Sequence, residues 1–488
     1  MSATTARSTP SQGAQKRTGP STTSPSPSAS SPAPRASASS PAGAKDVHDD
    51  VHELEFGGAP GTFAMMTCFP ALFYYLYCCL FFYDAKFAKP EDPYTLSGWV
   101  AFVQHLGRLV LDNAMPTQRS VALYTIFLVV QLLLAFVMPG VLQKGLPLPH
   151  LGNKALDYHC NAYTSVYTTI ALVAAAHYFH IGGFNMGEVI DLYGPLLTTA
   201  SIAGFLLAAV TYVFGERYRM SGNLVYDYFM GSTLNPRIGT VDIKMFCEIR
   251  ISWTLLFALA MGAVTKQYEQ YGYVSGNTAL FAWGTFIYLN ACAKGEQYIP
   301  QTWDMNFEKF GWLLSYWNLA GVPFSYAYPA IYMATHDPAT YAWSKPVIVI
   351  LFVVVTFAQA MMDISMAQKS HFKAVKTNTY IKRHTFPQFP YAELDNPKTF
   401  QTKRGELLVD GCWAYLRKPN YISDWTQAIV WALSAGINSK IPYFYPLFHG
   451  TMLLHRNARD DAKCARKYGD DWTRYKKLVP YSYIYGLI

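Results

Sequence analysis

One face of a helix predicted near the carboxyl end carries four polar side chains, at spacings of four, four and three residues: Arg456, Asp460, Cys464 and Lys467. Residues three and four apart share a helix face, and Tyr468 lies one turn beyond Cys464 on the same stripe. Arg and Lys hold phosphates, Asp accepts hydrogen bonds from a ribose hydroxyl or an amide, and Tyr stacks on planar rings. This face is therefore predicted to bind a charged, planar ligand, with a basic helix on anionic lipid as the simpler alternative.

The surrounding chain has the composition of a membrane protein. It is 51% hydrophobic and only 14% charged, whereas soluble domains carry about 25% charged residues. Apolar runs such as 120–142 and 345–363 are long enough to cross a bilayer. We therefore predict an all-α polytopic integral membrane protein. Its net charge of +8 is attributed to cytosolic loops and contact with membrane lipids, and no nucleic-acid partner is expected.

The apolar pattern predicts about ten transmembrane helices. The expected spans lie near residues 60–83, 120–142, 163–182, 193–214, 246–267, 277–295, 310–333, 345–363, 425–437 and 441–455. Residues 97–111, which contain His105 and Arg108, are expected at the membrane interface. The segment GLPLPHLGNKALDYHCNAY is expected to be a loop or irregular.

The domain organisation follows from these spans. Residues 1–50 form a Ser-, Pro- and Ala-rich tail that cannot bury a core and is predicted to be a disordered cytosolic segment. Residues 51–363 hold about eight spans, and 364–488 hold a basic loop followed by a hairpin and a helix. The positive-inside rule puts this basic loop, and with it the carboxyl-terminal clusters, in the cytosol.

Polar side chains also crowd a bend that follows the apolar run 277–295. Glu296, Tyr298 and Asp304 lie there, and Pro300 interrupts any helix. Irregular polar backbone at membrane depth is tolerated where it lines a cavity. These three side chains are therefore candidates for proton transfer.

The spans contain two further sets of polar residues. Glu248 and Arg250 are expected either to act in function or to form an ion pair at the start of their span. The single pair His177 and His180 offers too few ligands for a di-iron site, and the cysteines form no CxxC, so no metal site is predicted.

Several long motifs resemble the sterol reductase family, which reduces sterol double bonds with NADPH. The resemblance covers roughly residues 52 to 488 and rests on LLVDGCWAYLRKPNYISDW, IPYFYPLFHGTMLLHRNARDDAKCARKYGDDW and GNLVYDYFMGSTLNPRIG. HELEFGG, NACAKGEQYIPQTWDM and VPYSYIYGLI resemble the branch that acts on the C-24(28) bond, rather than the C-14 or C-7 branches. The resemblance implies a ten-helix domain of the endoplasmic reticulum membrane, with a cofactor pocket facing the cytosol and a sterol pocket open to lipid.

The resemblance also implies an NADPH site. The positions that match the family motif are Lys369, Lys373, Leu408, Trp413, Asn420, Tyr421, Asp460, Cys464, Lys467, Tyr468 and Tyr475, and Arg456 joins them through the helix face described above. The family's RHxNY is RKPNY here, so Lys418 replaces a histidine, and Lys373 stands where the family often has arginine. The implied partners are a sterol from the bilayer, membrane lipids and other enzymes of sterol synthesis.

The implied chemistry requires an acid as well as a hydride. An alkene that is not conjugated to a carbonyl accepts hydride poorly, so we expect a proton to reach C-28 first and a hydride from NADPH to reach the resulting cation at C-24. A dry pocket keeps a carboxylic acid protonated. The candidate donors are Asp460, by resemblance, and Glu296, Tyr298 and Asp304.

Three alternatives remain open from the sequence. The chain resembles C-14 and C-7 reductases of the same family, and a non-catalytic sterol-binding scaffold of this fold would share many motifs. An S-adenosylmethionine-dependent methyltransferase of the isoprenylcysteine type has a similar outline at its carboxyl end, but those chains are shorter and usually show RHPxYxG, where this chain has RKPNYIS.

Overall fold

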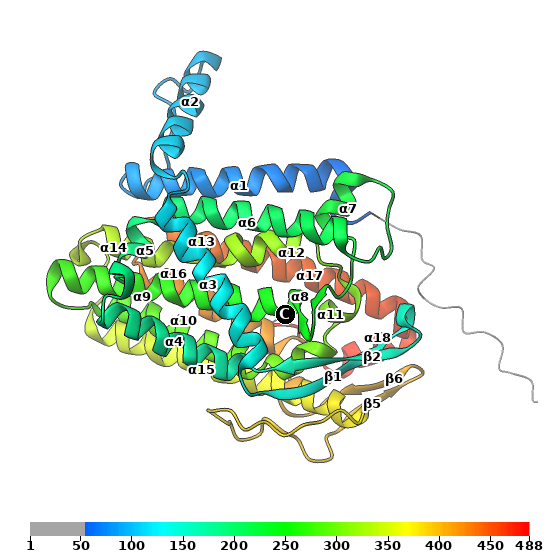
Figure 1. Cartoon of the computed structure of the whole chain (residues 1–488). Coiled ribbons are helices and arrows are strands. Elements are labelled where there is room, and N and C mark those ends of the chain that lie inside the picture. The colour runs from blue at the N-terminus through cyan, green and yellow to red at the C-terminus, as the bar shows by residue number, and fades with distance from the viewer. Residues whose placement is uncertain (1–53, 488) are drawn as a thin grey trace, which may run out of the picture. The chain divides into compact units, whose positions relative to one another are not determined.

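The computed structural model describes residues 54–487, most of which form helices (Figure 1). The tail predicted at residues 1–50 lies outside the described residues. Within residues 54–487, five helical segments have the length and hydropathy of a membrane span: Glu55–Phe82, Gln118–Val137, Tyr193–Phe214, Ile243–Tyr271 and Lys345–Lys376. These segments support the prediction of a membrane protein, while the count of ten spans stays a prediction.

The long apolar segments correspond to η1 with α1, to α3, to α6, to α8 with η4 and α9, and to α15. Their bounds are η1 Glu55–Gly57, α1 Gly58–Phe82, α3 Gln118–Val137, α6 Tyr193–Phe214, α8 Ile243–Phe246, η4 Cys247–Ile251, α9 Ser252–Tyr271 and α15 Lys345–Lys376. Shorter helices between them are α4 Ala162–Tyr178, η3 Ile181–Gly183, α5 Glu188–Asp191, α7 Leu224–Met230, α10 Gly276–Lys294, η5 Glu296–Gln301 and α11 Trp303–Phe307.

The predicted span 310–333 is broken into short pieces. They are α12 Trp312–Tyr316, the π-helical turn η6 Trp317–Gly321, α13 Val322–Ser325 and α14 Tyr328–Thr335, followed by η7 Pro338–Thr340. Pro323 and Pro329 account for two of the breaks, because proline lacks the backbone donor that a helix interior needs. A second π turn, η4, packs nearby, and the Ser252 hydroxyl beside it donates to the Asn318 amide oxygen in η6 at 2.9 Å.

The all-α prediction needs a correction, because the described part of the chain contains three antiparallel two-stranded sheets. Strands β1 Val141–Leu148 and β2 Lys154–Cys160 occupy the segment predicted to be irregular. The proline and glycine residues that suggested a loop belong to the turn η2 Pro149–Leu151, which ends at Gly152 with φ of 64°. The other hairpins pair β3 Arg237–Ile238 with β4 Val241–Asp242 and β5 Thr399–Thr402 with β6 Gly405–Leu408.

Helix α2 (Leu96–Asn113) corresponds to the segment expected at the membrane interface. None of its residues is buried among residues 54–487, and Figure 1 shows it standing away from the other helices. Its amino end is capped by the Thr95 side chain, which accepts from the Gly98 backbone amide. The interfacial placement stays a prediction.

Helix α15 is longer than predicted. It continues to Lys376, so the loop predicted to be cytosolic begins after residue 376 and not at 364. Residues 347–376 contain neither proline nor glycine, and Lys373 and Lys376 in the last turn favour the helix end electrostatically. Lys369 and Lys373 are therefore held on a helix.

The carboxyl-terminal helices also differ from the prediction of two short spans. Helix α16 runs from Pro419 to Ser434, and α17 runs from Phe444 to Tyr468 as one unbroken helix, entered through η9 Ile441–Tyr443. The short helix α18 (Asp470–Leu478) follows after Gly469, whose φ is 54°. Because α17 is continuous, its apolar first half and its polar second half share one axis.

The segment between α15 and β5 has no regular structure, yet side chains of β1 and of several helices hold its backbone carbonyls. Gln143 donates to Thr379 O at 2.9 Å, and Lys294 donates to Pro387 O at 2.8 Å. Similar bonds run from Gln297, Asn290 and Gln368 to the carbonyls of Ile381, Phe386 and Tyr391. The loop is therefore fastened along its length, and it leads directly into β5, β6 and η8 (Gly411–Ala414).

Candidate functional site

Helix α15 and the turn η8 together hold a partly buried lysine over a buried indole. The Lys369 ammonium lies 4.1 Å from the centroid of the Trp413 ring. Trp413 is only 4% exposed, and its indole nitrogen donates to Ser365 O at 2.9 Å. The ring is thus fixed from one side by α15 and covered on its face by a cation.

Gln368 ties the same turn to the preceding loop. Its amide oxygen accepts from Cys412 N at 2.9 Å, and its amide nitrogen donates to Tyr391 O at 2.8 Å. Gly411 has φ of 55°, and a Cβ there would lie 2.6 Å from the Gln368 amide. This close approach requires glycine, so Gln368 and Gly411 together position Trp413.

The predicted polar face of α17 is present, but its ion pairs are not within the helix. The Asp460 carboxylate pairs with Lys418 at 2.5 Å, and Arg456 pairs with Asp304 at 3.2 Å. The helical spacing would also allow Asp460 to pair with Arg456, but each side chain has its ion-pair partner in another element. Lys418 also lies 5.1 Å from the centroid of the Tyr421 ring. The residue that replaces the family's histidine thus joins the start of α16 to α17.

The end of α15 and the polar face of α17 form a single basic cluster. Lys369 is within electrostatic reach of Lys373, Lys418, Asp460 and Cys464. Lys373 is in turn within reach of Lys467. The cations outnumber the carboxylates in this cluster, so its field favours an anion.

Titration behaviour in the cluster follows from this field. Burial acts to raise the pKa of the Asp460 carboxyl, but the hydrogen bond and charge of Lys418 and the charge of Arg456 lower it below its ordinary value. Burial raises the pKa of Tyr421 to about 12 and also raises the pKa of the Cys464 thiol. At neutral pH, Asp460 is therefore an acceptor, while Tyr421 keeps its proton as a donor.

The remaining predicted cofactor residues lie in neighbouring elements. Tyr475 of α18 is buried within electrostatic reach of Cys464, and burial raises its pKa to about 12. Leu408 is buried in β6, where it pairs with Thr399. Lys467 lies 5.0 Å from the centroid of the Tyr468 ring. The described residues therefore bring most of the predicted set together around α15, α16 and α17.

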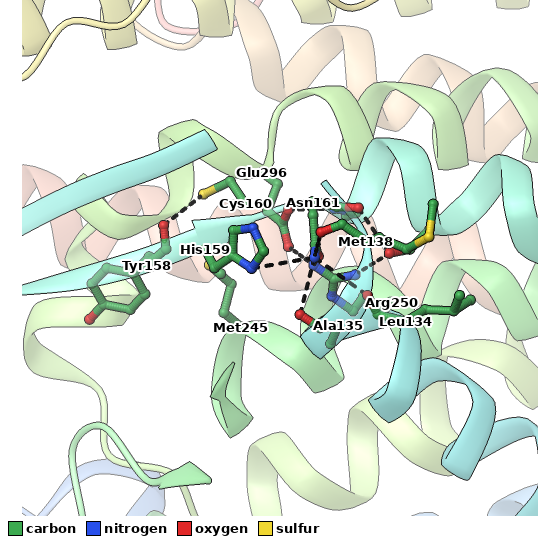
Figure 2. A network of polar contacts seen from close by, with 12 residues as sticks. Leu134, Ala135, Met138, Tyr158, His159, Cys160, Asn161, Met245, Arg250 and Glu296 are labelled. Carbon is green, nitrogen blue, oxygen red and sulfur yellow. Dashed lines mark hydrogen bonds and ion pairs between the residues drawn. The ribbon is translucent and has the colours of Figure 1, made fainter. Parts of the chain in front are cut away.

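Glu296 lies in a different buried network (Figure 2). Its carboxylate pairs with Arg250 at 2.8 Å and accepts from Ala162 N at 2.7 Å. Arg250 also donates to the Asn161 amide oxygen and to the Ser165 hydroxyl. The suggested pairing of Glu248 with Arg250 is therefore wrong, because Arg250 turns to a partner 46 residues away. With both oxygens engaged, Glu296 ties β2 and α4 to η4 and η5.

The amide of Asn161 completes that network. Its nitrogen donates to the carbonyl oxygens of Ala135, in the last turn of α3, and of Met138, directly after that helix, at 3.1 and 2.7 Å (Figure 2). Such carbonyls have no partner within their own helix. The network therefore has a structural explanation, which weakens the case for Glu296 as a proton donor.

Tyr298 and Asp304 also lie in places different from each other and from Glu296. Tyr298 lies in a polar pocket on another side of α15, lined also by Gln143, Gln301, His371 and Arg383, and its ring faces Arg383 at 4.8 Å. Asp304 joins the basic cluster through Arg456. The buried ammonium of Lys244 donates to Asp304 O and Glu308 O, both at 2.7 Å, and so fixes α11.

Sequence reasoning missed several residues that the structure places at or beside the site. They are Gln368, which positions Trp413, and the pair Asp424 and His449, joined at 3.0 Å between α16 and α17. A signal was present for Asp424: polar residues recur at 420, 424 and 427 inside an otherwise apolar helix. No group of three or more His, Cys, Asp or Glu side chains in residues 54–487 is placed to hold a metal ion.

Comparison with known proteins places these features in a family. Residues 50–488 match the model of the ergosterol biosynthesis ERG4/ERG24 family. A Delta(24(24(1)))-sterol reductase of Gibberella zeae is 43% identical over 437 residues, which cover 88% of this chain and 72% of the relative. The Delta(24(24(1)))-sterol reductase erg4A of Aspergillus fumigatus is 41% identical over 438 residues, covering 88% and 92%.

Relatives with a different named activity are less similar. A Delta(14)-sterol reductase of Methylotuvimicrobium alcaliphilum is 34% identical over 442 residues, which cover 88% of this chain and 96% of the relative. The match extends over the helical region and the carboxyl-terminal cluster alike, which displaces the methyltransferase alternative. The chain therefore belongs to the ERG4/ERG24 family of ergosterol biosynthesis.

Proposed function

We propose that this protein uses NADPH to reduce the C-24(28) double bond of a sterol side chain, in the last step of ergosterol synthesis. The relatives named Delta(24(24(1)))-sterol reductases are 43% and 41% identical to this chain, against 34% for a Delta(14)-sterol reductase. That difference favours the C-24(28) reaction over C-14 reduction.

The convergence of the Lys369–Trp413 and Lys418–Asp460 pairs carries the cofactor part of the proposal. Lysine ammonium groups suit the phosphates of a dinucleotide, and an ionised Asp460 suits a ribose hydroxyl or a carboxamide. The buried indole of Trp413 holds the Lys369 ammonium through a cation–π contact at 4.1 Å and so positions that charge for a phosphate. The chemistry of this donor set therefore fits NADPH.

The residues of the cluster would bind the cofactor in distinct ways. Lys369, Lys373 and Lys467 would hold phosphates, and Arg456 would add a bidentate donor while it keeps Asp304 in place. Asn420 and Tyr421 at the start of α16 would add an amide and a hydroxyl that hydrogen-bond the cofactor. When bound, NADPH supplies the hydride.

The protein must also deliver a proton. Asp460 is ionised in its salt bridge, and Glu296 is engaged by Arg250 and Ala162. Tyr298 and Asp304 contact Arg383 and Arg456. We therefore assign Asp460 to cofactor binding, and look for the acid outside the basic cluster.

The same charges bear on which side of the membrane the basic cluster faces. Basic residues at the end of α15, in the loop that follows and in α17 and α18 favour the cytosolic side. We propose a multi-pass protein of the endoplasmic reticulum membrane that takes its sterol from the bilayer, in contact with lipids and other enzymes of sterol synthesis. A scaffold without activity is disfavoured by the convergence of basic, acidic and aromatic side chains around α15, α16 and α17.

The test is reduction by the purified full-length chain in lipid nanodiscs, supplied with NADPH and a sterol that carries a C-24(28) methylene group. We expect NADPH oxidation matched by a product two mass units heavier. A sterol with only a C-14 double bond should remain unchanged. Reduction of the C-14 substrate alone would refute the assigned bond, and no reduction of either would favour the scaffold.

A further inference from the structure

One face of α16 carries polar atoms that are buried without a hydrogen-bond partner among residues 54–487. They are Asn420 Oδ1, Asp424 Oδ1, Gln427 Oε1 and Trp431 Nε1. The spacings of four, three and four residues place them in one line along the helix, which we call the α16 polar face. Buried polar atoms are nearly always paired, so a line of unpaired ones indicates an absent polar ligand or bound water.

The α16 polar face includes one half of a buried acid–base pair. His449 of α17 is 6% exposed, and its Nε2 lies 3.0 Å from Asp424 Oδ2. Its ring packs on Tyr445, with ring centroids 5.2 Å apart. Tyr288 and Cys292 of α10 are within electrostatic reach of Asp424. Because Nε2 faces the carboxylate, Nδ1 is the ring nitrogen that remains to exchange a proton.

Aromatic rings lie beside this pair and pack on one another. Tyr445 stacks on Tyr326 with ring centroids 3.7 Å apart, and it lies 5.6 Å from Trp431. Tyr288 lies 5.4 Å from Trp431 and 4.4 Å from Trp253. The faces of such rings attract cations, and their bulk excludes water. A carbocation that forms beside this pair would therefore be stabilised and protected from water.

The α16 polar face also connects this pair to the cofactor cluster. Asn420 is the second residue of α16, directly after Lys418–Pro419, and Tyr421 is within electrostatic reach of both Asp460 and Asp424. A helix rises about 1.5 Å per residue, so neighbouring members of the face are roughly 5–6 Å apart along the axis. One water molecule with hydrogen bonds of about 2.8 Å spans such a gap.

We propose that the His449–Asp424 pair supplies the proton for sterol reduction, and that the α16 polar face holds the waters that resupply it. The assignment rests on the proposed function. His449 gives its proton to C-28, the electron pair of the double bond forms the new C–H bond, and C-24 is left cationic. C-24 then takes the hydride, with its electron pair, that NADPH would supply. The neutral imidazole regains a proton from the line of waters along the α16 polar face, which we call the water file.

The pair acts in a region without the lysines that keep Asp460 ionised. Asp424 orients the imidazole through the 3.0 Å contact of its Oδ2 with His449 Nε2. The other carboxylate oxygen of Asp424, Oδ1, is the first acceptor of the water file. Gln427 Oε1 is the next acceptor, three residues further along α16. Asn420 Oδ1, Asp424 Oδ1 and Gln427 Oε1 can accept hydrogen bonds from these waters, and Trp431 Nε1 can donate one.

The experiment compares His449→Gln with wild type and with His455→Gln, a change of an exposed histidine on the same helix. Each is purified as the full chain in nanodiscs. For His449→Gln, we expect kcat to fall about 100- to 10,000-fold, as for loss of an acid catalyst. The Kd of NADPH should stay within about twofold of wild type, and the solvent deuterium isotope effect on kcat should increase, because proton transfer becomes slower. His455→Gln should match wild type.

Two further variants test the assignment at positions other than His449. Asp424→Asn keeps the size of the side chain and removes its charge, and Gln427→Leu replaces an acceptor of the file with an alkyl group. Both should lower kcat at least about tenfold without raising the Kd of NADPH, because the path that resupplies the proton is lost. An active wild type with His449→Gln and Gln427→Leu both within twofold of its kcat would overturn the assignment. Inactivity of wild type itself would instead refute the proposed function.

Discussion

Replacement of Gln368 by leucine should weaken NADPH binding although Gln368 need not touch the cofactor. The substitution removes two hydrogen bonds, of 2.9 Å from Cys412 N and 2.8 Å to Tyr391 O. Each is worth about 1 kcal/mol net, so the turn that carries Trp413 should lose about 2 kcal/mol of its docking energy on α15. If NADPH binding requires the docked turn, this is roughly a 30-fold rise in Kd.

The assay is calorimetric titration of NADPH into the purified full-length protein. Gln368→Glu keeps the acceptor for Cys412 N and loses the donor to Tyr391 O, so about half of the effect should remain. Gln401→Leu, a change of an exposed glutamine on β5, is the matched control and should bind as wild type does. A Kd for Gln368→Leu within twofold of wild type would refute the idea that this amide positions Trp413.

Three further perturbations test other contacts. Gly411→Ala should weaken NADPH binding as Gln368→Leu does, because its Cβ would lie 2.6 Å from that amide at φ of 55°; unchanged calorimetric affinity would contradict this. Glu296→Gln should lower thermal stability by about 3–5 kcal/mol, since it leaves Arg250 buried beside a neutral partner, and activity lost without any fall in Tm would instead favour a catalytic Glu296. Folding lowers the pKa of Asp460, so the ionised carboxylate stabilises the fold above about pH 4, and this stabilisation is lost as the pH falls through the folded pKa. Asp460→Asn should remove this part of the acid dependence of unfolding. Identical pH profiles of stability for the variant and wild type would exclude this contribution of Asp460.

Local sequence signals predicted the helix of the site but not its partners. The spacing of Arg456, Asp460 and Cys464 correctly placed these residues on one face of α17. The spacing also allowed an Arg456–Asp460 pair, whereas the structure joins them to Asp304 and Lys418. Partners 42 and 152 residues away depend on tertiary packing, which helical periodicity does not contain.

The errors in the elements have a similar origin. The β1–β2 hairpin was missed because its proline and glycine residues indicate turns, and the β1 register shifts between Lys144 and Pro147. The last three turns of α15 were predicted as loop because their lysines resemble a cytosolic segment. Yet Ser365 and Gln368 on those turns are buried against η8, so packing against a later segment keeps the helix intact.

The electrostatics of the cluster explain why an acid should be sought away from the cofactor. Lysines 369, 373, 418 and 467 favour bound phosphates, and the same positive field keeps a neighbouring carboxyl such as Asp460 ionised. A group in that field is a poor proton donor at neutral pH. Asp424 lies further along α16, and His449 faces it from α17, beside the ring of Tyr445. We infer that α16 serves both needs, with anion binding at its first turn and proton supply along its buried face.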